Sequence, residues 1–60
     1  MIVGRFSYNR ACEYLVKNGI ITEEEVVIKH HAQSDITIFQ MNGETVARYI
    51  ERLHGRLEVK

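Results

Sequence analysis

The chain of 60 residues carries eight basic and eight acidic side chains and one cysteine. This balance argues against a globally basic nucleic-acid-binding protein and against an acidic mimic of DNA, and one cysteine excludes an intrachain disulfide. The apolar fraction of 45% is that of a globular protein, and no apolar run is long enough to span a membrane. We therefore expect one small α+β domain over residues 1–60, in the cytoplasm, with a core that is marginal for its size.

The first part of the chain predicts a strand followed by a helix. Residues 1–6 are β-prone, and Ser7 is suited to be an N-cap, because its hydroxyl can accept a free amide of the next turn. Over residues 8–18 the apolar side chains recur at helical spacing, which predicts an amphipathic helix. Gly19 is placed to adopt the left-handed conformation that ends such a helix in a Schellman arrangement.

Residues 22–25, Thr-Glu-Glu-Glu, permit two interpretations. Thr22 and Glu25 match a capping box, so a helix could begin there. The β-branched triplet over residues 26–28 disfavours that helix. We expect a strand from residue 26 onward, preceded by three glutamates in an exposed loop.

A β-hairpin is the clearest feature of the middle of the chain. Residues 26–31 and 36–41 are rich in β-branched side chains and flank the polar residues 32–35. We favour a four-residue loop over a two-residue loop of the same register, and either loop pairs Val26 with Met41. Side chains alternate between the faces of a strand, so one face of this hairpin is apolar enough to be core. That face holds Val26, Ile28, Phe39 and Met41, with His30 and Thr37 near the turn.

The rest of the chain predicts a second helix. Asn42-Gly43 breaks the second strand, and the apolar spacing over residues 43–54 is helical, with a stripe formed by Val46, Ile50 and Leu53. Gly55 stops this helix, and residues 56–60 alternate as a final strand would. The expected fold is α+β, a small antiparallel sheet with two helices on one face in the order β-α-β-β-α(-β), ferredoxin-like in miniature.

No candidate catalytic or metal-binding group outweighs its structural interpretation. Cys12 falls on the apolar stripe of the first helix, where a free cysteine acts as a small hydrophobe. His30 and His31 are adjacent on a strand and point to opposite faces, so they cannot join one metal site, and His54 is expected in solvent. Phosphate-binding glycine loops and nucleophile motifs are missing from the sequence. We expect no catalytic residues, no cofactor and no bound metal.

The predicted binding surface is the second face of the hairpin, which mixes apolar and polar side chains and which neither predicted helix covers. Tyr14, directed away from the apolar stripe of the first helix, is a further candidate anchor. We expect a small regulator, adaptor or inhibitor that binds another protein through Tyr14, Val27, Lys29, His31, Ile36 and Ile38. We also expect a homodimer in which this face, or the edge strand beside it, meets its two-fold mate.

A nucleic-acid-binding regulator is the alternative. Arg48, Arg52 and Arg56 recur at every fourth position, so a continued helix would place them on one basic face. A solvated basic face is the commoner meaning of such a pattern. The sequence has no preceding helix at helix-turn-helix spacing and no aromatic pair that suggests a stacking platform for single strands.

Overall fold

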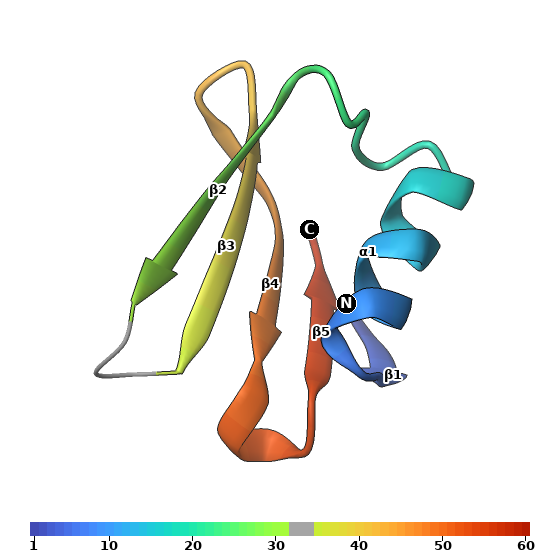
Figure 1. The fold of residues 1–60 in the computed structure, drawn as a ribbon, viewed down its shortest axis with the longest axis vertical. Coiled ribbons are helices and arrows are strands. Elements are labelled where there is room, and N and C mark those ends of the chain that lie inside the picture. The colour runs from blue at the N-terminus through green and yellow to red at the C-terminus, as the bar shows by residue number, and fades with distance from the viewer. Residues whose placement is uncertain (32–34) are drawn as a thin grey trace.

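The computed structural model describes residues 1–31 and 35–60, with the backbone alone at residues 30 and 31. Its elements in chain order are β1 (Ile2–Arg5), α1 (Tyr8–Lys17), β2 (Val26–His31), β3 (Ile36–Met41), β4 (Glu44–Ile50), a 3₁₀ helix (Glu51–Leu53) and β5 (Arg56–Val59) (Figure 1). Within the described ranges, no helix is long and apolar enough to cross a bilayer.

The strands form one five-stranded antiparallel sheet in the order β1-β5-β4-β3-β2. The strands β2 to β5 are a meander, in which each strand pairs with the next along the chain. The first strand, β1, pairs with the far side of β5, so β1 and β2 are the two edges of the sheet. Consequently α1 joins one edge strand to the other across a single face of the sheet (Figure 1).

The helix α1 begins and ends where the sequence predicts, to within one residue. The Ser7 hydroxyl oxygen accepts a hydrogen bond from the backbone N–H three residues further on, which confirms Ser7 as the N-cap. Gly19 follows the helix with a φ of 70°, and the N–H of Ile20 donates to the carbonyl of Leu15 at 2.9 Å. This left-handed glycine and this hydrogen bond are the predicted Schellman motif.

The predicted hairpin register is confirmed, as is the strand in preference to a helix after the glutamates. The Cα partners across β2 and β3 include Val26 with Met41, Ile28 with Phe39, and His31 with Ile36. The predicted loop covers residues 32–35, of which 32–34 lie outside the described residues. The faces of the hairpin therefore sort as alternation requires, with Phe39 fully buried on the core side.

The predicted second helix is wrong: most of its range is the strand β4. Asn42 and Gly43 both have positive φ, 54° and 78°, as a type I′ turn requires. This turn places Glu44 opposite Met41 and starts a second hairpin in register with the first. The apolar spacing of residues 43–54 is compatible with a helix, but a strand forms here. The strand completes the hydrogen-bonded ladder of β3 and places Tyr49 in the core.

The ferredoxin-like arrangement with two helices is therefore also wrong. The described part of the chain has one α-helix, α1, against a five-stranded sheet, so the fold is α+β with half of the expected helical cover. Gly55 has a φ of 74° and follows the short 3₁₀ helix, so it ends that turn and not a long helix. The final strand is confirmed as β5, which pairs with both β4 and β1.

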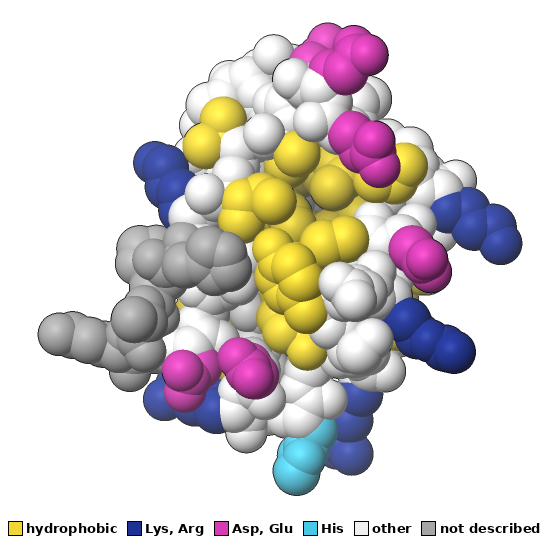
Figure 2. All heavy atoms as spheres, in the orientation of Figure 1, with side chains coloured by type: hydrophobic (Ala, Val, Ile, Leu, Met, Phe, Trp, Pro, Cys, Tyr) yellow, Lys and Arg dark blue, Asp and Glu magenta, His cyan; other side chains and the backbone are white. Residues whose placement is uncertain are grey.

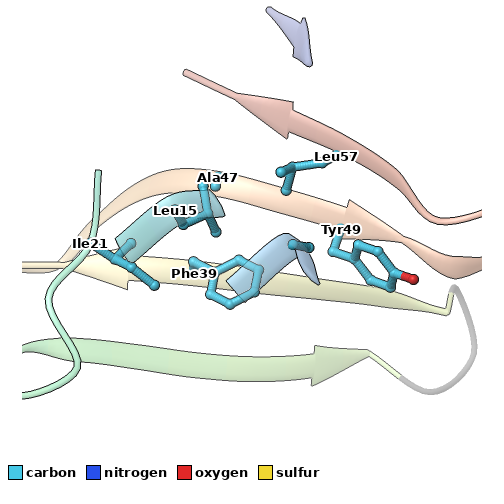
Figure 3. Packing of buried hydrophobic residues seen from close by; sticks show 7 residues of the cluster. Leu15, Ile21, Phe39, Ala47, Tyr49 and Leu57 are labelled. Atoms are coloured by element: carbon cyan, nitrogen blue, oxygen red, sulfur yellow. The ribbon is translucent and has the colours of Figure 1, made fainter. Parts of the chain in front are cut away.

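The core lies between α1 and the sheet, as Figure 3 shows. Its buried side chains come from the helix, from the segment that follows it and from three strands, and they are Ala11, Leu15, Ile21, Phe39, Ala47, Tyr49 and Leu57. The ring of Tyr8 lies edge-on to Tyr49 with centroids 5.6 Å apart, and it stacks on Phe39 at 6.4 Å. The Tyr49 hydroxyl donates to the carbonyl of Phe6 at 2.9 Å, which satisfies its polar end.

Candidate interaction surface

The face of the sheet opposite α1 is the surface on which the predicted sites gather, and we name it the open face. Strand alternation and the cross-strand pairing assign to it Ile2, Arg5, Val27, Lys29, Ile36, Ile38, Gln40, Thr45, Arg48, Ile50, Arg56 and Glu58. The helix α1 lies against the other side of the sheet, so no α-helix of the described residues covers this side. The open face is thus available to a partner.

One row of side chains crosses all five strands of the open face. Its successive Cα partners, from β2 to β1, are Lys29, Ile38, Arg48, Glu58 and Ile2. The half-buried Ile38 is therefore flanked by a cation on each side, and both cations are exposed. Opposed side chains in a sheet lie within contact range, so this row brings three charged and two apolar groups together at short spacing.

A second row runs beside the first. Ile36 pairs with Ile50, Ile50 pairs with Arg56, and Arg56 pairs with Arg5 on β1. The guanidinium of Arg56 forms an ion pair with Glu58 at 2.5 Å, which links the two rows. His31 extends this second row in the backbone ladder, where its Cα partner is Ile36.

The open face is basic although the whole chain is neutral. Among its described side chains are four cations, Arg5, Lys29, Arg48 and Arg56, and one carboxylate, that of Glu58. The apolar side chains between them remain accessible to different degrees: Val27 is 51% exposed, whereas Ile50 is only 9% exposed. A surface of this kind can contact a partner through its apolar side chains while its cations attract negative charge.

Two of the predicted site residues lie elsewhere. Tyr14 is half-buried on α1, on the other side of the sheet, and its ring packs on Phe6 with centroids 5.5 Å apart. Arg52 lies in the 3₁₀ helix, exposed, and does not share a helix face with the other two arginines. The open face thus unites Val27, Lys29, Ile36 and Ile38 of the first predicted set with Arg48 and Arg56 of the alternative set.

A groove on the helix-covered side is a feature that the sequence did not predict, and we name it the α1–β2 groove. It has a volume of about 540 Å³. Its apolar lining is formed by Cys12, Val16, Ile21, Val26, Ile28 and Phe39, and its charged rim by Glu13, Lys17 and Glu23. Figure 2 shows hydrophobic side chains gathered in a hollow at the centre of this face, with acidic side chains around them. The groove lies over the part of the sheet that the single helix α1 leaves uncovered, where the sequence predicts a second helix.

Cys12 lies in this groove as a free, half-buried thiol. Burial raises the pKa of Cys12 above its usual value, and a hydrogen bond with Tyr8 acts in the opposite direction. A raised pKa means little thiolate at neutral pH, which is the opposite of what a nucleophile needs. No three His, Cys, Asp or Glu side chains of the described residues come together as metal ligands would.

Sequence reasoning missed several members of the open face because it placed β4 in a helix. Ile50 was expected in a buried helical stripe, and Arg5 and Glu58 had no defined neighbours. The signal that identifies them is Asn42-Gly43, since that dipeptide between two β-prone runs is a strong indication of a hairpin. A comparison of the chain with protein-family models, with curated proteins and with solved structures finds no match.

Proposed function

We propose that this chain is a small regulator, adaptor or inhibitor that acts in the cytoplasm by binding another protein, and not by catalysis. The observation that supports this best is the open face, where accessible apolar side chains lie among four cations. Val27 and Ile38 supply apolar contact, and Lys29 and Arg48 flank Ile38 on both sides. Such a surface fits a partner that presents apolar side chains within an acidic rim.

The charge of the open face also bears on how the chain would associate with itself. Two open faces brought together about a two-fold axis would oppose eight cations to two carboxylates, which like-charge repulsion disfavours. We therefore propose that the expected homodimer forms through β2, the edge strand beside this face. That strand spans six residues and pairs on one side only with β3. An edge of this length offers unpaired backbone groups to a two-fold mate.

Affinity capture tests the protein-binding proposal. Wild-type chain and an Ile38→Asp variant would be used as parallel baits in a cell lysate, with bound proteins identified by mass spectrometry. The introduced carboxylate lies between Lys29 and Arg48, so the fold should tolerate it while the apolar centre of the open face is lost. Asn9→Asp, which adds the same charge at an exposed position of α1 outside the open face, is the matched control.

The proposal expects one protein that both the wild type and the Asn9→Asp bait retain and that the Ile38→Asp bait loses. A partner that all three baits retain equally would show that the open face is not the binding surface. Circular dichroism spectra of the three baits must coincide, because an unfolded variant would lose a partner for a trivial reason.

Nucleic-acid binding is the second candidate, and the four cations of the open face favour it as well. Arg5, Lys29, Arg48 and Arg56 come from four different strands, so they spread over the sheet instead of lining one helix. If each contacts a phosphate of a duplex, affinity should fall on the order of a hundredfold between about 50 and 200 mM salt. Titration of duplex and single-stranded oligonucleotides at the two salt concentrations tests this candidate, and the absence of binding at the lower concentration would contradict it.

A further inference from the structure

We propose that the α1–β2 groove is a second binding site, and that its occupant is an amphipathic helix of a partner protein with basic residues beside its apolar stripe. The groove lies on the opposite side of the sheet from the open face and shares no residue with it. The inference therefore goes beyond the proposed function, and its test depends on different side chains from those of the open face.

The size of the sheet leaves room for one more helix. Five strands at a spacing of about 4.8 Å make a sheet about 19 Å wide between its edge strands, whereas a helix with its side chains is about 10 Å across. The helix α1 fills the part of the face above Phe39, Ala47 and Leu57, all of which are fully or almost fully buried. The part above β2 is left without a covering element among the described residues, and the groove lies there, between β2 and α1.

The exposure of the groove lining is unusual for residues that face a core. On the core side of β2, Ile28 is 42% exposed, and across the groove on α1, Val16 is 38% exposed. Ile28 is the cross-strand partner of Phe39, whose side chain is fully buried and lines the groove together with Ile28 and Val16. An apolar lining of this kind is how one protein receives the apolar stripe of another protein's helix.

The rim of the groove indicates the charge of the occupant. Two carboxylates, those of Glu13 and Glu23, and one cation, Lys17, line it. Glu24 and Glu25, which follow Glu23 in the chain, are also exposed and add negative charge beside the rim. A helix that carries lysine or arginine on the flanks of its apolar stripe would complement this rim, whereas an acidic helix would be repelled.

Three synthetic peptides test this proposal. The first is a side-chain-stapled helix with leucine at i, i+3, i+4 and i+7 and lysine on the flanks, because stapling removes the entropic cost of ordering the peptide. The second is the same helix with glutamate in place of each lysine. The third is a scrambled form of the lysine helix without an apolar stripe.

The native thiol reports occupancy directly. Cys12 is the only cysteine of the chain and lies in the groove. The lysine helix should slow alkylation of Cys12 by iodoacetamide about fivefold or more at saturation, and it should bind about tenfold more tightly than the glutamate helix. The scrambled peptide should leave the alkylation rate unchanged, since charge alone does not fill an apolar groove.

Paired variants locate the site. Val16→Gln and Ile28→Thr replace partly exposed apolar groups while keeping helix and strand propensity, so both should fold and both should lose the lysine helix. Ile38→Asp on the open face should retain it, and this separates a failure of this proposal from a failure of the open-face proposal.

Four results would overturn the inference. They are a lysine helix that does not bind, equal binding of the glutamate helix, binding that survives both groove variants, and protection of Cys12 by a rise in protein concentration alone. The last result would identify a second copy of this chain as the occupant.

Discussion

The backbone of Gly55 lies directly against the backbone of Phe6. The Phe6 N–H donates to the Gly55 carbonyl at 2.9 Å, and a Cβ atom built on Gly55 would lie 1.9 Å from the Phe6 carbonyl oxygen. The same oxygen accepts the hydroxyl of Tyr49, to which that Cβ would come within 2.7 Å. Only glycine permits the segment before α1 and the segment before β5 to approach this closely.

The first prediction compares two glycines of similar φ. Gly55→Ala should lower the free energy of unfolding by more than about 3 kcal/mol, since the methyl group displaces Phe6 and breaks the Tyr49 hydrogen bond. Gly19→Ala should cost only about 1 kcal/mol, because its φ of 70° is strained for alanine but no atom lies within 4 Å. Urea denaturation followed by circular dichroism measures both, and equal costs would contradict the close approach at Gly55.

The second prediction orders three core and surface truncations. Phe39→Ala should cost about 3–5 kcal/mol, which is enough to unfold most molecules of a domain of this size. Ile28→Ala should cost about 1–2 kcal/mol, because Ile28 faces the core side but is 42% exposed. Ile36→Ala, half-buried on the open face, should also cost far less than Phe39→Ala. If Ile28→Ala proves as damaging as Phe39→Ala in urea denaturation, the groove is closed in solution.

The third prediction concerns alkaline pH. Burial raises the folded-state pKa of Cys12 above the usual 9.0 of a cysteine, and it raises the pKa values of Tyr8 and Tyr49 above the usual 10.0 of a tyrosine. A raised pKa stabilises the fold fully below the unfolded pKa, and this contribution is lost as the pH rises through the folded pKa. The urea midpoint should therefore be flat up to about pH 8.5 and fall above it.

A variant identifies the contribution of the thiol to this alkaline fall. A thiol ordinarily titrates below a phenol, so Cys12→Ala removes the group whose contribution is lost first as the pH rises. The urea midpoint of this variant should begin to fall at a higher pH than that of the wild type. Coincident pH profiles for the two proteins would show that Cys12 does not take part.

The fourth prediction tests the proposed dimer through β2. The thermal midpoint should rise with protein concentration, since only the assembled chain pairs that edge. Ile38→Asp should leave the dimer intact, because Ile38 lies on β3, one strand in from the edge, and its side chain is on the open face. Sedimentation equilibrium of both proteins is the measurement. Dissociation of the Ile38→Asp variant would place the contact on the open face instead, and a monomer at high micromolar concentration would refute the dimer altogether.

The fold could be predicted where local signals and tertiary packing agree. Ser7 and Gly19 delimit α1 in the sequence as in the structure, because capping groups act within one turn. The register of β2 and β3 followed from the predicted loop between them, with the apolar alternation of the two strands in support. The prediction failed at β4, where Val46 and Ile50 also fit a helical period and only the left-handed turn at Asn42 and Gly43 decides for a strand.

That one failure explains most of what was missed at the candidate sites. Once β4 is a strand, Arg48 becomes a neighbour of Ile38, and the two surfaces that the sequence presented as alternatives merge into the open face. Because the predicted second helix does not form, Ile28 and Val16 are partly exposed, although sequence periodicity assigns them to a core. Burial of these residues depends on how many helices cover the sheet, and no local pattern carries that number.

The crossing of α1 from one edge of the sheet to the other has a kinetic consequence. Within the meander from β2 to β5 each strand pairs with the next one along the chain, whereas β1 meets β5 at contacts such as that between the N-terminal amine and the carbonyl of Val59, 58 residues apart. Contacts so distant in sequence carry a large loop-closure entropy, so they form late in folding and open early. The amide protons of β1 should therefore exchange with solvent faster than those of β3, and we expect the docking of β1 to be the last step in folding.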